Sequence, residues 1–346
     1  MRVLSLFDGI SCGQVALERA GIPVEVYYAS EIDKYAIQVT QKNYPNTIQL
    51  GDVTKIDFTK FIGKIDLLIG GSPCQDLSIA GARKGLSGER SGLFYKFVEA
   101  LEVIKPKYFL LENNVGMPRD AYEEISRLMG CYPIEINSAL VSAQNRKRYY
   151  WTNIGDKNYN LFGFPTCAIP QPENKGLVIK DVLEQNVDEK YYLSDTRVKR
   201  FRQTPKNKNI GTVKLRKDSI GQKDIIYDIN NKMGCLTASD CKSAKLILVG
   251  YINTNSQGNR VYDIKGKGIT LSTGGGDTST GLYLVCDKKK YRIRRLTPLE
   301  GERLQTLPDN YTSVLSDTRR YNCIGNGWTV DVIAHIFKHI LDTTKN

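Results

Sequence analysis

The chain has 346 residues, of which 41% are hydrophobic and 25% charged, a balance typical of one or two globular domains. Its formal net charge is +12, and the segment 191–290 holds 19 basic but only 8 acidic residues, so nearly all of the excess lies there. A surface of this sign attracts a polyanion. No apolar run approaches the ~20 residues of a membrane span, and the first run meets Asp8 too early for a signal peptide. We expect a cytoplasmic protein without a membrane partner.

Cysteine and histidine content disfavours both a disulfide framework and a metal site. The eight cysteines are scattered without a C-x-x-C pair. The two histidines, His335 and His339, share one helix face near the C-terminus, and no cysteine accompanies them. We therefore expect no structural or catalytic metal in this chain.

Short apolar runs alternate with helical stretches from Arg2 to about Ile154. In chain order, the expected elements are strand 3–7, helix 14–20, strand 24–29, helix 34–44, a strand that ends at Asp52, strand 66–69, helix 93–104 and strand 108–111. Strands that are apolar throughout and alternate with helices are typical of a parallel sheet covered on both faces. This part of the chain is therefore predicted to be α/β.

The amino-acid composition of the chain changes after about Phe164. Three prolines lie close together there, and short β-branched runs follow, mixed with Gly, Asn, Lys and Thr. We expect a second, β-rich domain over residues 161–291, with 1–160 and 292–346 forming the first domain. The apolar residues of 327–341 recur on one helix face, so this C-terminal helix is expected to return to the first domain.

Polar residues follow the ends of the first predicted strands. The turn 7–13 contains Gly9 and Gly13, which let the chain turn tightly and a ligand approach the backbone. Glu31 ends the second strand, where an acid commonly binds ribose hydroxyls, and Asp52 ends the third. The glycine spacing differs from the G-x-G-x-x-G of dinucleotide sites, so a nucleoside cofactor without a pyrophosphate fits better. A plain strand–turn–helix without any ligand is the alternative.

Two further strand ends and a basic run carry chemically useful side chains. Cys74 follows a strand in a Gly- and Pro-rich loop, where a thiol can meet substrate, and the alternative is a small buried thiol that fills space. Glu112 ends an apolar strand and can act as an acid when it is partly desolvated. Arg146 and Arg148 lie in a basic run that is followed directly by aromatic residues. The alternative to a functional role for this run is a solvated basic turn.

The order of these segments resembles the motif set of the DNA cytosine-5 methyltransferase family. The match covers roughly 1–155 and 292–337, and the runs 2–10 and 69–74 are especially similar to the animal de novo DNA methyltransferases. The resemblance implies a Rossmann-like, S-adenosylmethionine-dependent methyltransferase domain with a mostly parallel sheet, plus a smaller β-rich target-recognition domain. The motifs that carry it are Pro73-Cys74, Glu112-Asn113, Gln144-x-Arg146-x-Arg148, 294–300, 303–305 and Gly325-Asn326-Gly327-Trp328.

The chemistry of that family gives each matching residue an expected role. A thiolate adds to ring carbon 6 of cytosine, and carbon 5 then takes a methyl group from S-adenosyl-L-methionine, which leaves as S-adenosyl-L-homocysteine. The resemblance makes Cys74 the nucleophile and Glu112 the group that hydrogen-bonds or protonates ring nitrogen 3. Arg148, with Arg146 nearby, neutralises charge at oxygen 2. Because carbon 6 is inaccessible inside a duplex, the base must be flipped out.

The same matching implies a set of binding residues. Cofactor contacts are expected at Phe7, Asp8, Gly9, Ile10, Ser11, Cys12, Glu31, Ile32, Asp52, Val53, Pro73, Asn326, Gly327 and Trp328. Cys12 stands where many members have Gly, and Gly327 where many have Ser. DNA contacts are expected at Ser72, Gln75, Ser78, Arg197, Lys199, Arg200, Arg202, Lys214 and Arg216. The basic residues of this set lie in the segment of excess charge and are expected to pair with phosphates.

Two other functions remain as alternatives. A transfer-RNA cytosine-5 methyltransferase would keep the same motifs, but that branch of the family usually has a small recognition insert, whereas the region 161–291 is large and basic. A catalytically inactive DNA-binding regulator is disfavoured because Cys74, Glu112 and Arg148 are all intact. We expect a monomeric enzyme on double-stranded DNA, and any cognate restriction endonuclease would act separately.

Overall fold

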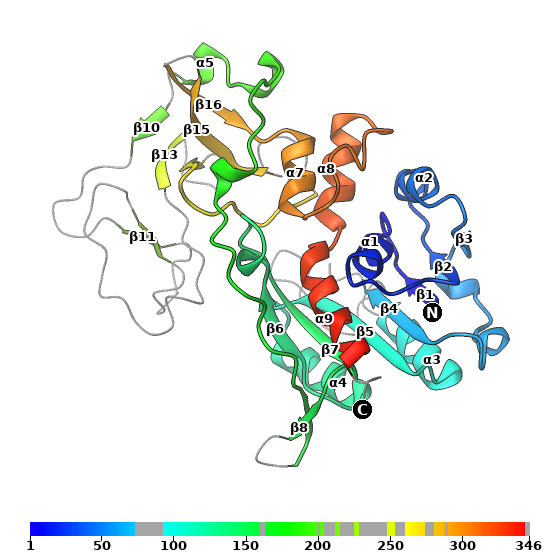
Figure 1. Cartoon of the computed structure of the whole chain (residues 1–346). Coiled ribbons are helices and arrows are strands. Elements are labelled where there is room, and N and C mark those ends of the chain that lie inside the picture. The colour runs from blue at the N-terminus through cyan, green and yellow to red at the C-terminus, as the bar shows by residue number, and fades with distance from the viewer. Residues whose placement is uncertain are drawn as a thin grey trace. The chain divides into compact units, whose positions relative to one another are not determined.

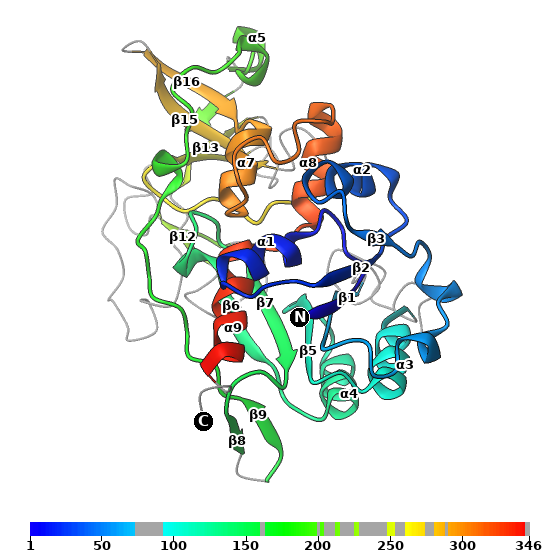
Figure 2. The ribbon, with the colours of Figure 1, turned by 45° about the vertical axis from the view of Figure 1, so that its right-hand side comes forward.

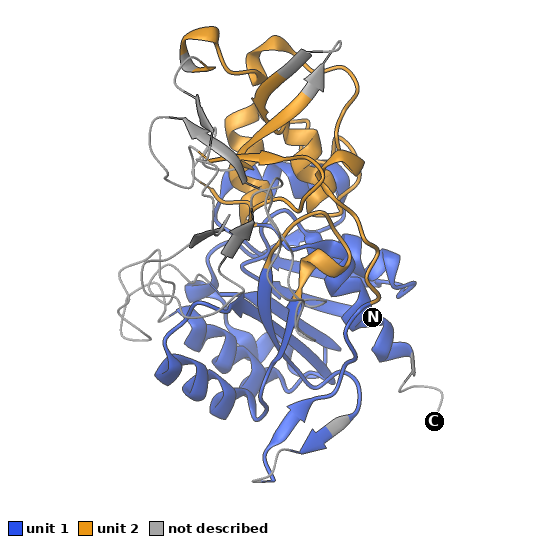
Figure 3. Cartoon of the chain, turned by 90° about the vertical axis from the view of Figure 1, so that its left-hand side faces the viewer, with its two compact units in different colours: residues 1–136, 147–172, 327–346 blue, residues 137–146, 173–326 orange. Residues whose placement is uncertain are grey.

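The computed structural model describes residues 1–72, 93–159, 163–198, 201–203, 212–214, 225–227, 248–252, 260–273, 280–287 and 290–342. The chain divides into two compact units, drawn in blue and orange in Figure 3. Unit 1 contains residues 1–136, 147–172 and 327–346, and unit 2 contains residues 137–146 and 173–326. The contacts of 292–326 thus place this segment in unit 2, whereas the division expected from the sequence joins it to the catalytic region. That division by function, at 161 and 292, stays a prediction.

Unit 1 is built on a seven-stranded sheet with the order β3-β2-β1-β4-β5-β7-β6 (Figure 1). Its strands are β1 (Arg2–Leu6), β2 (Val26–Ser30), β3 (Ile48–Gln49), β4 (Leu67–Gly71), β5 (Tyr108–Asn114), β6 (Ile134–Asn137) and β7 (Lys147–Thr152). The pairs among β1 to β5 are parallel, and β7 joins β5 antiparallel. The carboxyl ends of β1, β2, β4 and β5 therefore share one edge of the sheet, where ligands bind in such folds.

Helices cover both faces of this sheet, because successive residues of its apolar strands point to opposite sides. The helices are α1 (Cys12–Arg19), α2 (Lys34–Asn43), α3 (Phe94–Ile104), α4 (Arg119–Met129) and α9 (Val330–Asp342), with 3-10 turns η1 (Val53–Lys55) and η2 (Phe58–Phe61). Leu4 and Leu68 pack in one buried cluster with Phe97 of α3 and Ile125 of α4. This cluster forms the core on the α3 and α4 side.

The opposite face of the sheet lies against α1 and α9, which pack side by side (Figure 2). A Cβ atom added to Gly13 of α1 would lie 2.5 Å from Cδ1 of Ile69, so the absence of a side chain lets this helix approach β4 closely. Arg19 at the end of α1 forms an ion pair with Asp331 of α9 at 2.5 Å. The C-terminal helix thus belongs to unit 1, as expected from the pattern of 327–341.

Unit 2 is rich in β-structure. Its five-stranded sheet has the order β10-β13-β14-β15-β16, and β11 pairs with β12. The strands are β10 (Phe201–Gln203), β11 (Thr212–Lys214), β12 (Ile225–Tyr227), β13 (Leu248–Ile252), β14 (Arg260–Asp263), β15 (Leu282–Asp287) and β16 (Lys290–Arg295); the helices and turns are η5 (Ser138–Leu140), η6 (Ile179–Asp181), η7 (Glu189–Tyr191), α5 (Asp195–Val198), α7 (Pro298–Leu304) and α8 (Asp317–Asn326). Tyr262, Tyr283, Leu296 and Ile324 share its main buried cluster.

The predicted α/β part and the β-rich part are both confirmed, and one expected strand end is wrong. Strand β3 ends at Gln49, and Asp52 instead caps η1, where its carboxylate accepts from the Thr54 backbone N–H at 2.9 Å.

The remaining strands of unit 1 are a short hairpin of β8 (Lys157–Tyr159) and β9 (Pro165–Cys167). Among the described residues, no helix is both long and apolar enough to cross a membrane.

Candidate active site

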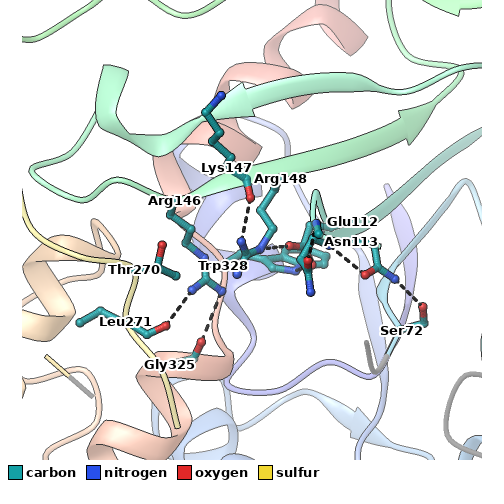
Figure 4. Close-up of polar contacts among 12 residues, drawn as sticks. Ser72, Glu112, Asn113, Arg146, Lys147, Arg148, Thr270, Leu271, Gly325 and Trp328 are labelled. Atoms are coloured by element: carbon teal, nitrogen blue, oxygen red, sulfur yellow. Dashed lines mark hydrogen bonds and ion pairs between the residues drawn. The ribbon is translucent and has the colours of Figure 1, made fainter. Parts of the chain in front are cut away.

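An acid and a cation meet at the carboxyl end of β5 (Figure 4). In the antiparallel pairing of β5 with β7, Asn114 lies opposite Arg148, which brings the Arg148 side chain back toward Glu112. Its Nε forms an ion pair with Oε1 of Glu112 at 2.8 Å, and the side chains are 17% and 12% exposed, respectively. Arg148 also donates through Nη1 to the Lys147 carbonyl at 2.7 Å. A carboxylate and a guanidinium are thus held together with limited access to water.

A third side chain, Trp328, completes the surroundings of the Glu112 carboxylate. Its indole Nε1 donates to Oε2 of Glu112 at 3.1 Å. The two groups meet beside Gly71 at the end of β4, where an added Cβ would lie 3.0 Å from each of these atoms. Trp328 was expected among the cofactor contacts, whereas Gly71 had no expected role. Gly71 has no side chain and lies at the end of a strand, and this was the one feature of the local sequence that pointed to the close approach of Trp328 and Glu112.

The segment with the expected nucleophile begins directly after this point. Gly71 pairs with Glu112 in the β4–β5 register, and Ser72 follows, 5% exposed. The buried Asn113 amide donates to the Ser72 hydroxyl at 3.2 Å and so ties the start of the segment to β5. Pro73, Cys74, Gln75 and Ser78 lie outside the described residues. The roles predicted for these four residues and for Ser72 on DNA stay predictions.

The turn after β1 has an unusual backbone that Glu31 holds in place. Phe7, Gly9 and Ser11 all have positive φ, at 60°, 61° and 57°, so three alternate residues occupy a conformation that costs energy for the two that carry a side chain. The Gly9 N–H donates to Oε2 of Glu31 at 2.8 Å, and Oε1 accepts from the Ile32 N–H at 2.7 Å. Glu31 thus joins the carboxyl ends of β1 and β2, the position expected for a nucleoside site.

Asp8 lies in this turn with two hydroxyl partners. Tyr27 of β2 donates to Oδ1 at 2.8 Å, and the Ser11 hydroxyl donates to Oδ2. Burial raises the pKa of Asp8 to about 6, despite these hydrogen bonds, which favour the charged form. Tyr27 was not predicted, and its contact depends on the side of β2 to which it points.

The other expected cofactor residues of unit 1 differ in exposure. Ile32 is 77% exposed, which is unusual for a large apolar side chain and fits a flat ligand above it. Ile10, Cys12 and Val53 are buried, at 1%, 2% and 5%. A ligand would meet these three through the backbone. Asp52 has its pKa lowered by its hydrogen bonds to the Thr54 N–H and hydroxyl.

A nucleoside fits the acceptors and apolar surface present here. A carboxylate offers about four lone-pair sites, and Glu31 uses three of them on the backbone N–H groups of Gly9, Ile32 and Asp33. One site on Oε2 is left for a ribose hydroxyl. The exposed Ile32 lies next to it in the chain, where it offers an apolar surface to a base.

Arg146 belongs to unit 2 and differs from Arg148 in its contacts. It is 5% exposed and donates through Nη1 and Nη2 to the carbonyls of Leu271 and Gly325, both at 3.3 Å. These bonds brace two backbone segments of unit 2 (Figure 4). Asn326, exposed at the end of α8, also lies in unit 2, whereas Gly327 and Trp328 lie in unit 1. The catalytic role of Arg146 and the cofactor role of Asn326 stay predictions.

Few of the expected basic DNA contacts lie on described elements. Arg197 is on α5, Arg202 on β10 and Lys214 on β11. Lys199, Arg200 and Arg216 lie outside the described residues. Within the described ranges, no cluster of three or more His, Cys, Asp or Glu could hold a metal ion.

Comparison with known proteins defines first the fold class and then the family. The chain superposes on the methyltransferase EhMeth of Entamoeba histolytica with a TM-score of 0.68 and 15% identity, over 100% of this chain and 99% of that one. The chain therefore shares the fold of that methyltransferase, a Rossmann-like, mostly parallel sheet together with a β-rich unit. The family described as C-5 cytosine-specific DNA methylase matches residues 1–128 and 136–342, and the chain belongs to this family. The resemblance drawn from the motifs is thereby confirmed.

Relatives that match nearly the whole chain in sequence come from phage and bacteria. The chain is 29% identical to the orphan methyltransferase M.SPRI of Bacillus phage SPR, over 100% of this chain and 98% of that one. It is 28% identical to the type II methyltransferase M.HhaI of Haemophilus parahaemolyticus, over 98% of this chain and 94% of the relative. Family and fold both imply the use of S-adenosylmethionine.

Proposed function

We propose that this chain is a sequence-specific DNA methyltransferase that transfers a methyl group from S-adenosyl-L-methionine to carbon 5 of a flipped-out cytosine. The observation that carries the proposal is the Glu112–Arg148 pair at the carboxyl end of β5. Gly71, the sheet partner of Glu112, lies three residues before Cys74. An acid, a cation and a thiol are the groups that cytosine activation needs, and family membership supports this assignment.

In the proposed mechanism, the chain first makes carbon 5 of cytosine nucleophilic. The Cys74 thiolate forms a bond to carbon 6, and the ring electrons move toward carbon 5 and nitrogen 3. Glu112 shares a proton with nitrogen 3, and Arg148 stabilises the negative charge that develops at oxygen 2. When bound, S-adenosyl-L-methionine supplies the methyl group that carbon 5 takes up. Loss of the carbon-5 proton then breaks the carbon–sulfur bond and restores the thiolate.

The remaining expected residues would bind the two substrates. Glu31 would hold the ribose and Ile32 the base of the cofactor, with the backbone of the turn at 7–12 around its amino-acid part. Asp52, Val53, Pro73, Asn326, Gly327 and Trp328 complete the proposed contacts. The basic segment 191–290 would hold double-stranded DNA through phosphates and read its sequence, as a target-recognition domain. We propose a monomer that works in the cytoplasm on nucleoid DNA, and a restriction endonuclease would be a separate protein.

The experiment expresses the chain in cells and sequences their DNA after chemical conversion of unmethylated cytosine. We expect cytosine-5 methylation in one sequence context, and none with Cys74→Ala, which should still bind cofactor and DNA because the thiolate serves activation and not docking. A DNA duplex with 5-fluorocytosine at the target should trap a covalent complex with the wild type, because carbon 5 cannot lose a proton there.

The outcomes separate the alternatives. Methylated transfer RNA with unmodified DNA would support the RNA enzyme instead. DNA binding without any methylation or trapped complex would support an inactive regulator. Unchanged turnover of Cys74→Ala would contradict the mechanism itself.

A further inference from the structure

The two oxygens of the Glu112 carboxylate each contact a nitrogen from a different part of unit 1. Arg148 Nε forms an ion pair with Oε1 at 2.8 Å, and Trp328 Nε1 donates a hydrogen bond to Oε2 at 3.1 Å (Figure 4). Rotation of the carboxylate about its last side-chain bond would lengthen both contacts. Because this terminal torsion is otherwise broad, the two donors together select one orientation of the carboxylate plane.

The indole reaches Glu112 through space that two glycines leave open. A Cβ on Gly71 would lie 3.0 Å from both Oε2 of Glu112 and Nε1 of Trp328. A Cβ on Gly13, in the first turn of α1, would lie 3.8 Å from Cζ3 of Trp328. The ring therefore borders the end of β4, the Glu112 carboxylate and the helix that follows the proposed cofactor turn.

We propose that Trp328 is a positioning residue for methyl transfer, whose N–H acts with Arg148 to orient the Glu112 carboxylate toward the cytosine ring. This inference rests on the proposed function of Glu112. A carboxylate has about four lone-pair sites. The ion pair engages one oxygen and the hydrogen bond the other, which leaves a site on each oxygen for the substrate. Trp328 acts through Glu112 and not on the base.

The chain offers a matched control, because it contains only two tryptophans. Trp328→Phe keeps an aromatic ring but removes the N–H that Glu112 accepts. Trp151→Phe removes the other indole donor, whose Nε1 donates to the Ser126 hydroxyl at 3.0 Å in the core. Both variants lose one indole hydrogen bond of similar length, and only one of these bonds ends on Glu112.

The test measures the single-turnover rate of methyl transfer to a DNA duplex and the Kd for S-adenosyl-L-methionine in the wild type and both variants. We expect Trp328→Phe to lower the rate about 5- to 100-fold, because a slightly misplaced catalytic group can cost about 10²-fold. The Kd for the cofactor should stay within about twofold, because Phe keeps the aromatic ring at the proposed cofactor contact and loses only the N–H. Trp151→Phe should keep the rate per folded molecule within about twofold. Gly71→Ala, which crowds the same contact from β4, is a second variant that should also lower the rate.

A double variant shows whether the effect passes through Glu112. In a Glu112→Gln background, Trp328→Phe should change the rate less than about twofold, because no carboxylate remains to be oriented. An equal fold-loss in both backgrounds, or equal rates for Trp328→Phe and Trp151→Phe, overturns the positioning role. A loss of cofactor affinity with an unchanged rate at saturation overturns it too. Absence of methylation by the wild type would instead refute the proposed function.

Discussion

Removal of the Glu300 carboxylate tests how much the interior of unit 2 depends on one buried ion pair. Arg294 of β16 and Glu300 of α7 are 2% and 0% exposed, and Nη1 and Nη2 each reach one carboxylate oxygen at 2.7 Å. The same carboxylate accepts from the backbone N–H groups of Thr297 and Glu184, both at 2.8 Å. Glu300→Ala would therefore leave a buried guanidinium and two backbone donors without their acceptor.

The expected loss is large because the charge left behind is buried. Breaking a buried pair by removing one partner costs about 3–5 kcal/mol. The exposed Glu189–Arg292 pair of the same unit gives the control, because its two bonds of 2.9 and 2.5 Å are as short, while the Glu189 side chain is 76% exposed. Such a pair contributes about 0–1 kcal/mol, so Glu189→Ala should have little effect.

Calorimetric scans of the wild type and both variants measure this difference. A loss of 3–5 kcal/mol lowers the Tm of a unit of this size by roughly 6–20 °C, whereas 1 kcal/mol lowers it by about 2–4 °C. Replacement of both partners, as Arg294→Met with Glu300→Leu, should recover part of the loss: no unpaired charge remains, while the N–H groups of Thr297 and Glu184 still lack their acceptor. Equal Tm values for Glu300→Ala and Glu189→Ala would refute the reasoning.

Three further predictions concern the Glu112–Arg148 pair, the turn after β1 that is proposed to bind the cofactor, and the basic segment 191–290. Glu112→Gln and Arg148→Ala should each lower the single-turnover rate by about 10² to 10⁴, the usual range for a positioned acid, and rates within a few-fold of wild type would contradict their roles. Because the pKa of Asp8 is raised from 3.8 to about 6, the folded state binds this proton more tightly than the unfolded chain. The protonated Asp8 side chain therefore stabilises the folded state fully below about pH 4, and this stabilisation is lost as pH rises to about 6. The free energy of unfolding in urea, measured across pH 4–7, should fall over this range in the wild type and not in Asp8→Asn. Neutralising Arg197, Arg202 and Lys214 together should flatten the salt dependence of DNA binding by up to about 2.7 log units per decade of salt and leave S-adenosylmethionine binding unaltered, and an unchanged slope would exclude phosphate contacts by these side chains.

The sequence alone determined the elements of unit 1 from β1 to β5, the C-terminal helix α9, and most of the strand ends that carry polar groups, with Asp52 as the exception. Apolar strands and amphipathic helices leave local periodic patterns, and an acid at the end of an apolar run is visible without knowledge of its neighbours. Glu31 and Glu112 were found in this way. The function came from the order of several short motifs, which the family match confirms.

Contacts between distant segments were decided only by the tertiary structure. Trp328 and Glu112 are 216 positions apart, and their hydrogen bond depends on the path of the chain through unit 2 and back. Arg146 lies just before β7 and Arg148 lies on it, two residues apart, but one braces backbone carbonyls and the other pairs with Glu112. Sequence spacing gives the side on which a strand residue points, whereas its partner is fixed by which strand lies beside it and in which register.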